Sequence, residues 1–273
     1  MPDPPLARFR GTIHYDGSDF RGWQLQPTVR TVQGDVESSL SRLTSAERRV
    51  TAAGRTDTGV HAVGQEISFD VPPSWQPAEL CRGLNALLPS DIWIERLGRA
   101  PDDFHPRFDA LARRYEYLVD DRDRSPILGG RVWNLGSTVP GRLDEDVLAE
   151  ATRLVPGDRS FRAFSKAGQP DRGTRCTVDK AVWCRSPAGL LHFTIVADRF
   201  LHRMVRYLVS TLVEVATGRR NRQELEQLLA EEEEGIRPPV PAPPWGLYLT
   251  GVRYSDGWNR PPGVPGLVPH RSG

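Results

Sequence analysis

Cysteine is scarce in this chain, and long apolar runs are missing. The 273 residues include three cysteines, an odd number without C-x-x-C spacing, so neither a disulfide framework nor a zinc site is expected. Unpaired thiols are typical of a reduced cytoplasmic compartment. No apolar run reaches about 18 residues, which argues against a membrane span. The Pro-rich start, residues 1–5, lacks the basic and apolar regions of a secretory signal. We therefore expect a cytoplasmic protein without membrane contact.

An excess of either charge is also missing. Lysine and arginine number 36 and the acidic residues 35, which leaves a formal net charge of +1. A polyanionic partner would therefore have to be bound by a local basic patch rather than by total charge. With 38% hydrophobic and 26% charged residues, the composition is that of a soluble globular protein of one large domain or two ordinary ones.

Hydrophobic periodicity predicts the same order of elements twice. Each half, 6–105 and 112–254, is expected to run strand-helix-strand-strand-helix-strand. This pattern predicts the α+β class, with two ferredoxin-like βαββαβ halves whose antiparallel sheets face a central cleft. In RNA-binding modules of this topology the sheet face left bare by the helices is the binding surface. The Gly- and Pro-rich residues 256–273 are expected to form a disordered tail.

The loop at residues 54–62, GRTDTGVHA, is the most informative stretch of the chain. It places Asp57 between two glycines, with Arg55 two residues earlier, and in an extended segment the two side chains point the same way. A neighbouring guanidinium favours the anionic form of a carboxylate, which can then act as a nucleophile or as a base. The plainer alternative is an Asp-Thr-Gly turn whose aspartate bonds its own backbone. The full string is less generic than such a turn and predicts a catalytic loop.

Residues 57–59, Asp-Thr-Gly, also form the tripeptide of aspartic proteases. Those enzymes need two such aspartates that share one proton. This chain has no second Asp-Thr-Gly, and Arg55 would oppose proton sharing. The protease reading is therefore disfavoured.

A long helix is predicted over residues 200–217, followed by Gly218. Four cations recur at i, i+3, i+4 and i+7 and predict a basic stripe on its first two turns. Cations there oppose the helix dipole, but a phosphate backbone would be bound by them and by the free N–H groups. The alternative is a solvated polar face. The stripe, with candidate RNA contacts, consists of Arg199, His202, Arg203 and Arg206, the last lying nearest the apolar side.

The strand around residues 113–117 places Arg113, Tyr115 and Tyr117 on one face. A tyrosine ring on an open sheet can stack on a nucleobase, and arginine can stack or bind phosphate. Core packing of one of the two rings is the alternative. Arg113 and Tyr115 are therefore further candidates for contact with RNA.

Taken together, these segments resemble the tRNA pseudouridine synthase A family over about residues 8–254. One motif alone would be weak, but so many in the right order make the resemblance specific. The matching segments are YDG at 15–17, GWQ at 22–24, the loop at 54–62, FH at 104–105, RF at 107–108, RRY at 113–115, FL at 200–201, MVR at 204–206 and GLYL at 246–249.

The resemblance implies an isomerase that converts uridine to pseudouridine at positions 38, 39 and 40 in the anticodon stem-loop of tRNA. It implies a homodimer that works without a metal or cofactor. It further implies that Asp57 is catalytic, that Arg55 pairs with it and helps hold the flipped nucleotide, that Tyr115 packs on the target base and that Arg206 is a cleft arginine. A non-enzymatic RNA-binding module that keeps the same fold is the remaining alternative.

Overall fold

The computed structural model describes residues 5–122, 128–136, 142–166, 173–232, 234–261 and 263–264. The backbone divides into two compact units. Unit 1 comprises Met1–Leu111 and Leu249–Pro262, and unit 2 comprises Ala112–Tyr248 and Gly263–Gly273. Both units combine helices with strands, which confirms the α+β class. In the described part of the chain, no helix is both long and apolar enough to cross a membrane.

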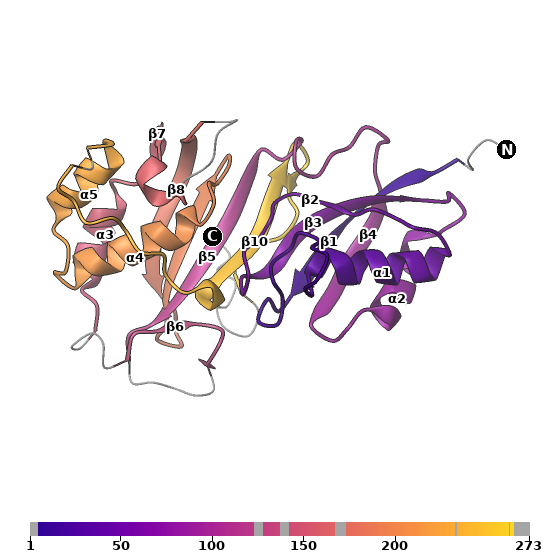
Figure 1. Cartoon of the computed structure of the whole chain (residues 1–273), viewed down its shortest axis with the longest axis horizontal. Helices are drawn as coiled ribbons and strands as arrows, with labels where there is room; N and C mark the ends of the chain where they lie inside the picture. Colours follow the sequence, from indigo (N-terminus) through magenta and orange to yellow (C-terminus); the bar gives the residue numbers. More distant parts are fainter. Residues whose placement is uncertain are drawn as a thin grey trace. The chain divides into compact units, whose positions relative to one another are not determined.

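Unit 1 has the strand-helix-strand-strand-helix-strand order that was predicted for the first half. Strand β1 lies between β4 and β3, β2 pairs with β3, and these pairings are all antiparallel. Both helices lie on one face of these strands (Figure 1). The elements are β1 (Ala7–Tyr15), α1 (Val32–Thr44), β2 (Thr51–Ala52), β3 (His61–Val71), α2 (Pro77–Leu87) and β4 (Ile92–Arg99).

The alternation of side chains along β1 separates the two faces of this sheet. Phe9 and Ile13 are fully buried, and Phe9 stacks on Phe69 of β3 with a centroid distance of 6.2 Å. Arg10 and Thr12, at the intervening positions, point to the opposite face because successive side chains in a strand alternate. The helices therefore cover the apolar face of the sheet, and the polar face carries the charged groups.

Unit 2 departs from the predicted order because it contains additional short elements. Its strands run β5-β9-β8-β7, all antiparallel, while the two-residue β6 pairs parallel to β5. Strands as short as β6 and β7 carry too few residues to show a period of two. The elements are β5 (Ala112–Asp120), β6 (Trp133–Asn134), α3 (Glu145–Thr152), β7 (Gly157–Ser160), η3 (Arg162–Phe164), β8 (Arg175–Arg185), β9 (Leu191–Ala197), α4 (Met204–Ala216), α5 (Arg222–Leu229) and η4 (Pro244–Gly246). The described strands belong to one 11-stranded sheet, so the prediction of two separate sheets is wrong, while the cleft itself stays a prediction.

Strand β10 (Leu247–Tyr254) begins in unit 2 and continues in unit 1 from Leu249 onward. The sequence assigned all of residues 112–254 to the second half. Most of β10 nevertheless falls within unit 1, where it lies beside β3. Element order along the chain does not report which unit receives the last strand.

The predicted disordered tail is wrong for its described part. β11 (Gly257–Trp258) pairs with the end of β10, and Asn259 beyond it is only 6% exposed. The Asn259 side chain accepts a hydrogen bond from Val252 N at 2.8 Å and donates one to Glu66 Oε2 at 2.9 Å. Strand pairing and the Asn259 side chain therefore hold in place a segment whose Gly- and Pro-rich composition predicted disorder. Residues 262 and 265–273 of the predicted tail lie outside the described residues.

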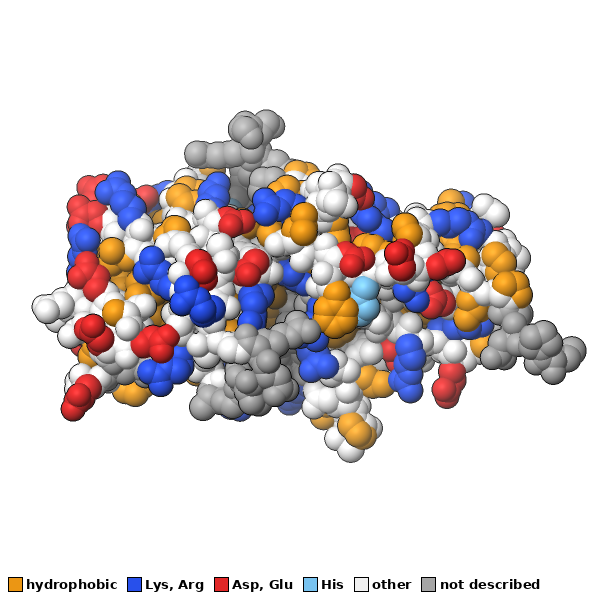
Figure 2. Space-filling view, turned by 90° about the horizontal axis from the view of Figure 1, so that it is seen from above, with side chains coloured by type: hydrophobic (Ala, Val, Ile, Leu, Met, Phe, Trp, Pro, Cys, Tyr) orange, Lys and Arg blue, Asp and Glu red, His pale blue; other side chains and the backbone are white. Residues whose placement is uncertain are grey.

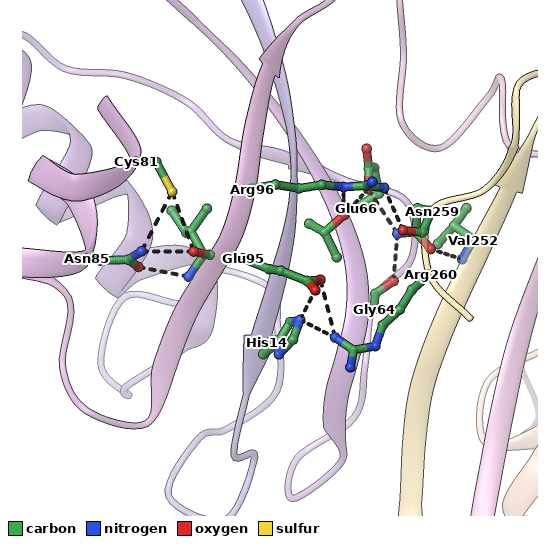
Figure 3. Close-up of polar contacts among 12 residues, drawn as sticks. His14, Gly64, Glu66, Cys81, Asn85, Glu95, Arg96, Val252, Asn259 and Arg260 are labelled. Carbon is green, nitrogen blue, oxygen red and sulfur yellow. Dashed lines mark hydrogen bonds and ion pairs between the residues drawn. The ribbon is translucent and has the colours of Figure 1, made fainter. Parts of the chain in front are cut away.

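The segment after β10 covers part of the polar face of unit 1 (Figure 3). Arg96 donates to the hydroxyl of Thr12 at 3.1 Å and also to the carbonyl oxygen of Asn259. Arg260 lies 2.9 Å from His14 Nε2 and 3.2 Å from the Glu95 carboxylate. The face that was expected to be bare is therefore occupied in part by the chain itself.

Candidate active site

Asp57 lies in a tight turn between β2 and β3. The amide of Val60 donates to the Asp57 carbonyl oxygen at 3.1 Å, and Gly59 at the third turn position has a φ of 77°. A β-turn of this kind needs positive φ at that position, which glycine adopts without steric cost. Asp57 is half-buried and Arg55 is exposed. The loop therefore presents a half-buried carboxylate and, two residues earlier, an exposed guanidinium, and the pairing of Arg55 with Asp57 stays a prediction.

Hydrogen bonds fix the backbone just before Asp57. The side-chain amide of Gln65 donates to the Gly54 carbonyl oxygen at 2.7 Å and accepts from Gly54 N at 3.3 Å. The hydroxyls of Tyr15 and Thr56, both buried, lie 2.8 Å apart, and Trp23 N donates to the Thr56 carbonyl oxygen at 3.1 Å. Strands β1 and β3 therefore hold this part of the loop from two sides.

The backbone just after Asp57 is held by the segment 16–18. His61 Nδ1 lies 3.0 Å from Gly17 N and 3.1 Å from Asp16 Oδ1. The hydrogen bond with His61 holds the pKa of Asp16 well below its usual range, against the opposing effect of burial, and bonds from Ser18 act in the same direction. A Cβ at position 17 would lie 2.1 Å from the Val60 carbonyl oxygen. The loop at 57–60 therefore packs directly on backbone that only glycine permits.

The YDG and GWQ motifs both contact the Asp57 loop. Gly22 has a φ of 91°, and a Cβ there would lie 2.8 Å from the Thr56 carbonyl oxygen. Through the contacts of Tyr15, Gly17 and Trp23, both motifs pack against the Asp57 loop and support it. The signal in the sequence was a glycine within two residues of an aromatic residue in each motif.

Tyr115 and Arg206 both lie in unit 2. Tyr115, on β5, is 8% exposed, and its ring meets Phe200 edge-on at 5.0 Å. Arg206, in the first turn of α4, is 9% exposed and donates from Nε to the Ala242 carbonyl oxygen at 2.7 Å. Tyr117 is fully buried and donates to the Pro243 carbonyl oxygen at 2.7 Å, so the core alternative holds for that ring. Tyr115 and Arg206 are therefore fixed side chains.

The predicted basic stripe on the long helix is wrong. Helix α4 begins at Met204, because Arg203 has a φ of 66° and this left-handed conformation cannot continue a helix. Arg199, His202 and Arg203 precede the helix, and only Arg206 lies on it. The periodicity misled because buried Leu201 continues the apolar pattern into a turn, where Met204 N donates to the Leu201 carbonyl oxygen at 3.1 Å.

The structure does bring two of the predicted RNA contacts together. Arg113 donates to the carbonyl oxygen of Asp198 at 2.9 Å, and the backbone amide of Arg199 donates to the Asp198 carboxylate at 2.7 Å. The carbonyl oxygen of His202 accepts from Lys166 N at 3.3 Å. Contact of these residues with RNA stays a prediction. Within the described residues, no group of three or more His, Cys, Asp or Glu side chains is arranged to hold a metal ion.

Comparison with known proteins gives a consistent result. A family model described as tRNA pseudouridine synthase matches residues 12–109 and 151–255. The tRNA pseudouridine synthase A of Methylacidiphilum infernorum is 39% identical over 251 residues, which covers 91% of this chain and 96% of the relative. The proteins of that name from Dictyoglomus turgidum and Oceanobacillus iheyensis are 40% and 35% identical and cover 91% and 93% of this chain and 100% and 99% of their own length.

Among solved structures, an archaeal box H/ACA sRNP Nop10–Cbf5 complex matches with a TM-score of 0.35 and 11% identity over 76% of this chain and 43% of that one, a likeness too weak to support an argument. The relatives found by sequence are far more similar to this chain, and the matches cover nearly the whole length of each relative. The chain therefore belongs to the tRNA pseudouridine synthase family.

Proposed function

We propose that this protein isomerises uridine to pseudouridine at positions 38, 39 and 40 in the anticodon stem-loop of tRNA, with Asp57 as the catalytic carboxylate. Family membership supports the reaction and the tRNA substrate. The construction of the loop supports the role of Asp57. A half-buried carboxylate sits on backbone that is held on both sides by buried groups of β1 and β3. Such preorganisation is what a group that acts on a bound nucleotide requires.

The substrate must be distorted before this carboxylate can reach it. A uridine inside a stem-loop is stacked, so it has to leave its stack to expose the ribose and the base. Arg55 is exposed two residues before Asp57 and is suited to hold a phosphate or the flipped nucleotide. Tyr115 and Arg206 are each fixed by neighbouring groups. Tyr115 is proposed to pack on the target base, and Arg206 is proposed to contact the substrate as a cleft arginine.

The reaction is an exchange of one glycosidic bond for another. The C1′–N1 bond breaks, the uracil turns, C5 bonds to C1′, and the hydrogen of C5 is lost while N1 gains one. Bond breaking places positive character on the ribose, which the Asp57 carboxylate can stabilise, capture or relieve by removing a C2′ proton. Because the uracil stays in the site, no activated donor is needed, and the chain has no nucleotide-cradling glycine motif.

Release of tritium from tRNA labelled at uridine C5 tests the proposal, because C5 loses its hydrogen in this reaction. We expect release from transcripts that keep a uridine at only one of positions 38, 39 and 40. A transcript with cytidine at all three positions is the control. If the wild-type protein released no tritium above background from any of these transcripts, the proposed activity would be excluded.

The Asp57→Asn variant tests the catalytic role separately from binding. We expect tritium release to fall by about 10³-fold or more, as for other essential catalytic groups, with the Kd for tRNA little changed. Asp19→Asn, an exposed aspartate in the same unit, is the matched control and should keep full activity. Residual turnover above about a tenth of wild type would mean that another group performs the chemistry.

The second candidate, a non-enzymatic RNA-binding module, predicts tight tRNA binding without tritium release, so the same assay separates the two. The homodimer and the cytoplasmic location expected from the sequence also stay part of the proposal. Sedimentation equilibrium tests the dimer, since a chain of 30.5 kDa would sediment with twice that mass.

A further inference from the structure

A cysteine, a histidine and a carboxylate lie side by side on three neighbouring strands of unit 2, and the proposed function uses none of them. Cys184 on β8 is directly opposite His192 on β9 in the antiparallel register. Leu118 of β5 is opposite His192 on the other side, so Glu116 is the diagonal neighbour of the imidazole. Direct and diagonal neighbours across strands are within reach of one another.

The Glu116 carboxylate orients the imidazole of His192. Glu116 is fully buried, and its Oε2 lies 2.8 Å from His192 Nε2. Its Oε1 accepts from Gly263 N at 2.9 Å and lies 3.5 Å from Arg114 Nε. Burial alone would raise the pKa of Glu116, but the hydrogen bond from His192 and these other partners lower it. An ionised carboxylate therefore faces Nε2 of the histidine.

The imidazole in turn faces the sulfur. His192 Nδ1 lies 3.7 Å from Cys184 Sγ. Burial lowers the pKa of His192, but the bonds with Cys184 and Glu116 outweigh it and raise the pKa to about 9. At neutral pH both ring nitrogens then carry hydrogen, so Nε2–H donates to Glu116 and Nδ1–H donates to the sulfur. A cation within hydrogen-bond distance stabilises a thiolate over a thiol.

The other two cysteines have different surroundings. Cys176 is 1% exposed, and burial raises its pKa to about 11. Cys81 is half-buried like Cys184, but its sulfur lies 3.5 Å from the Ile94 carbonyl oxygen and 3.7 Å from the neutral side-chain amide nitrogen of Asn85, and burial raises its pKa. Cys81 and Cys184 can therefore be compared within one molecule, because both are half-buried and their polar neighbours differ.

We propose that Cys184 is a reactive thiolate that forms mixed disulfides with small-molecule disulfides, with His192 and Glu116 as its activating pair. The Cys184 proton is released to solvent when the thiolate forms. The thiolate attacks one sulfur of the disulfide, the S–S bond breaks, and the departing thiolate takes a proton from solvent. Cys184 is oxidised and the small disulfide is reduced. His192 keeps both protons throughout.

Alkylation by iodoacetamide, followed by mass spectrometry of the three cysteine peptides, tests the proposal within one molecule. At pH 6.5 we expect Cys184 to react at least about tenfold faster than Cys81, because a stabilised thiolate persists below the usual thiol pKa. Between pH 6.5 and 8.5 the Cys184 rate should change little, whereas the Cys81 rate should rise about tenfold per pH unit. Parallel pH profiles for the two cysteines would overturn the proposal.

Two variants test the activating pair. His192→Asn and Glu116→Gln should each lower the Cys184 rate at pH 6.5 by about tenfold, with the Cys81 rate unchanged. Cys176 reports on folding in the same sample, because it becomes reactive only where its surroundings open. An unchanged Cys184 rate in a folded His192→Asn protein contradicts the proposal. If both variants expose Cys176, the wild-type pH profile decides alone.

The disulfide step itself is tested with the neutral probe 2-hydroxyethyl disulfide at pH 6.5. We expect the adduct at Cys184 and little at Cys81, with the adduct at Cys184 removed by dithiothreitol. Equal labelling of the two cysteines would contradict the proposal. None of these measurements involves tRNA, so they are independent of the proposed function.

Discussion

Thr56 joins the loop that carries Asp57 to strand β1. Its hydroxyl lies 2.8 Å from that of Tyr15, and its carbonyl oxygen accepts from Trp23 N. Burial raises the pKa of Tyr15 to about 12, so this phenol stays neutral and serves as a hydrogen-bonding group. The position of Asp57 therefore depends on residues that do not themselves take part in chemistry.

The Thr56→Val variant should loosen the loop without removing the carboxylate. The loss of one buried hydrogen bond costs about 1–3 kcal/mol when its partner stays unsatisfied. Displacement of a positioned group lowers turnover, so we expect kcat to fall by about tenfold with KM for tRNA little changed. Thr58→Val, an exposed position in the same turn, is the control. Equal effects of the two substitutions would show that the Tyr15 contact is not required.

Gly22 is a second residue whose substitution should act through the loop. Alanine there would combine a φ of 91° with a Cβ 2.8 Å from the Thr56 carbonyl oxygen. We expect Gly22→Ala to lower the free energy of unfolding by more than about 1 kcal/mol and to reduce tritium release. Gly54→Ala is the control, because a Cβ at Gly54 meets nothing within 4 Å. Urea unfolding of both variants measures the difference.

At the scale of elements, periodic apolar residues predicted most helices and strands. Strand β9 spans Leu191–Ala197 as its alternation predicts, and helix α1 follows Thr31, whose hydroxyl accepts from Gly34 N at 3.3 Å. The prediction that the long helix begins at residue 200 was wrong, because side-chain periodicity does not report the left-handed φ of Arg203. The pattern of a strand or helix is therefore predictable, whereas its ends depend on backbone conformation.

Helix α5 shows how much one terminal residue contributes. The Asn221 side chain accepts from Glu224 N at 2.8 Å, and the Glu224 carboxylate accepts from Asn221 N at 2.9 Å, which completes a capping box. Asn221→Ala should cost about 1 kcal/mol of stability. Gln223→Ala, at an exposed position in the first turn, should cost little. Thermal unfolding of the two variants checks the prediction, which equal melting temperatures would contradict.

At the scale of the whole molecule, positive and negative side chains are mixed rather than segregated. Figure 2 shows blue and red groups interspersed over the visible face of each unit, in agreement with a net charge of +1. The sequence located the Asp57 loop and the family motifs, since these are local strings. It could not show which polar groups support the loop, because Tyr15, Gln65 and His61 meet it only through the pairing of β1 and β3.

Stability of the fold should fall at both ends of the pH range. Asp121 is paired with Arg185 at 2.9 Å and accepts from Leu143 N at 3.0 Å; burial raises its pKa, but these partners lower it overall. Its contribution is present above a pH of about 4 and is lost as the pH falls toward the folded pKa. His192 has the opposite sign, so its contribution is present below its usual pKa and is lost as the pH rises through about 9.

The Asp121→Asn variant tests the acid side. We expect it to unfold at a lower urea concentration than wild type at pH 7, and the difference should narrow as the pH falls below about 4. Glu232→Gln, at an exposed position of unit 2, is the control and should follow wild type throughout. A difference that stayed constant down to pH 2 would mean that the Asp121 charge does not contribute.

The entry of β10 into unit 1 has a consequence for synthesis of the chain on the ribosome. Unit 1 lacks one strand until residues beyond Leu249 emerge, and all of Ala112–Tyr248 is translated in the meantime. At 5–20 residues per second this delay lasts roughly 7 to 27 s. During that interval the part of β3 beside which β10 will lie is an open edge in the nascent chain. The first unit to emerge is therefore among the last parts of the protein to be completed.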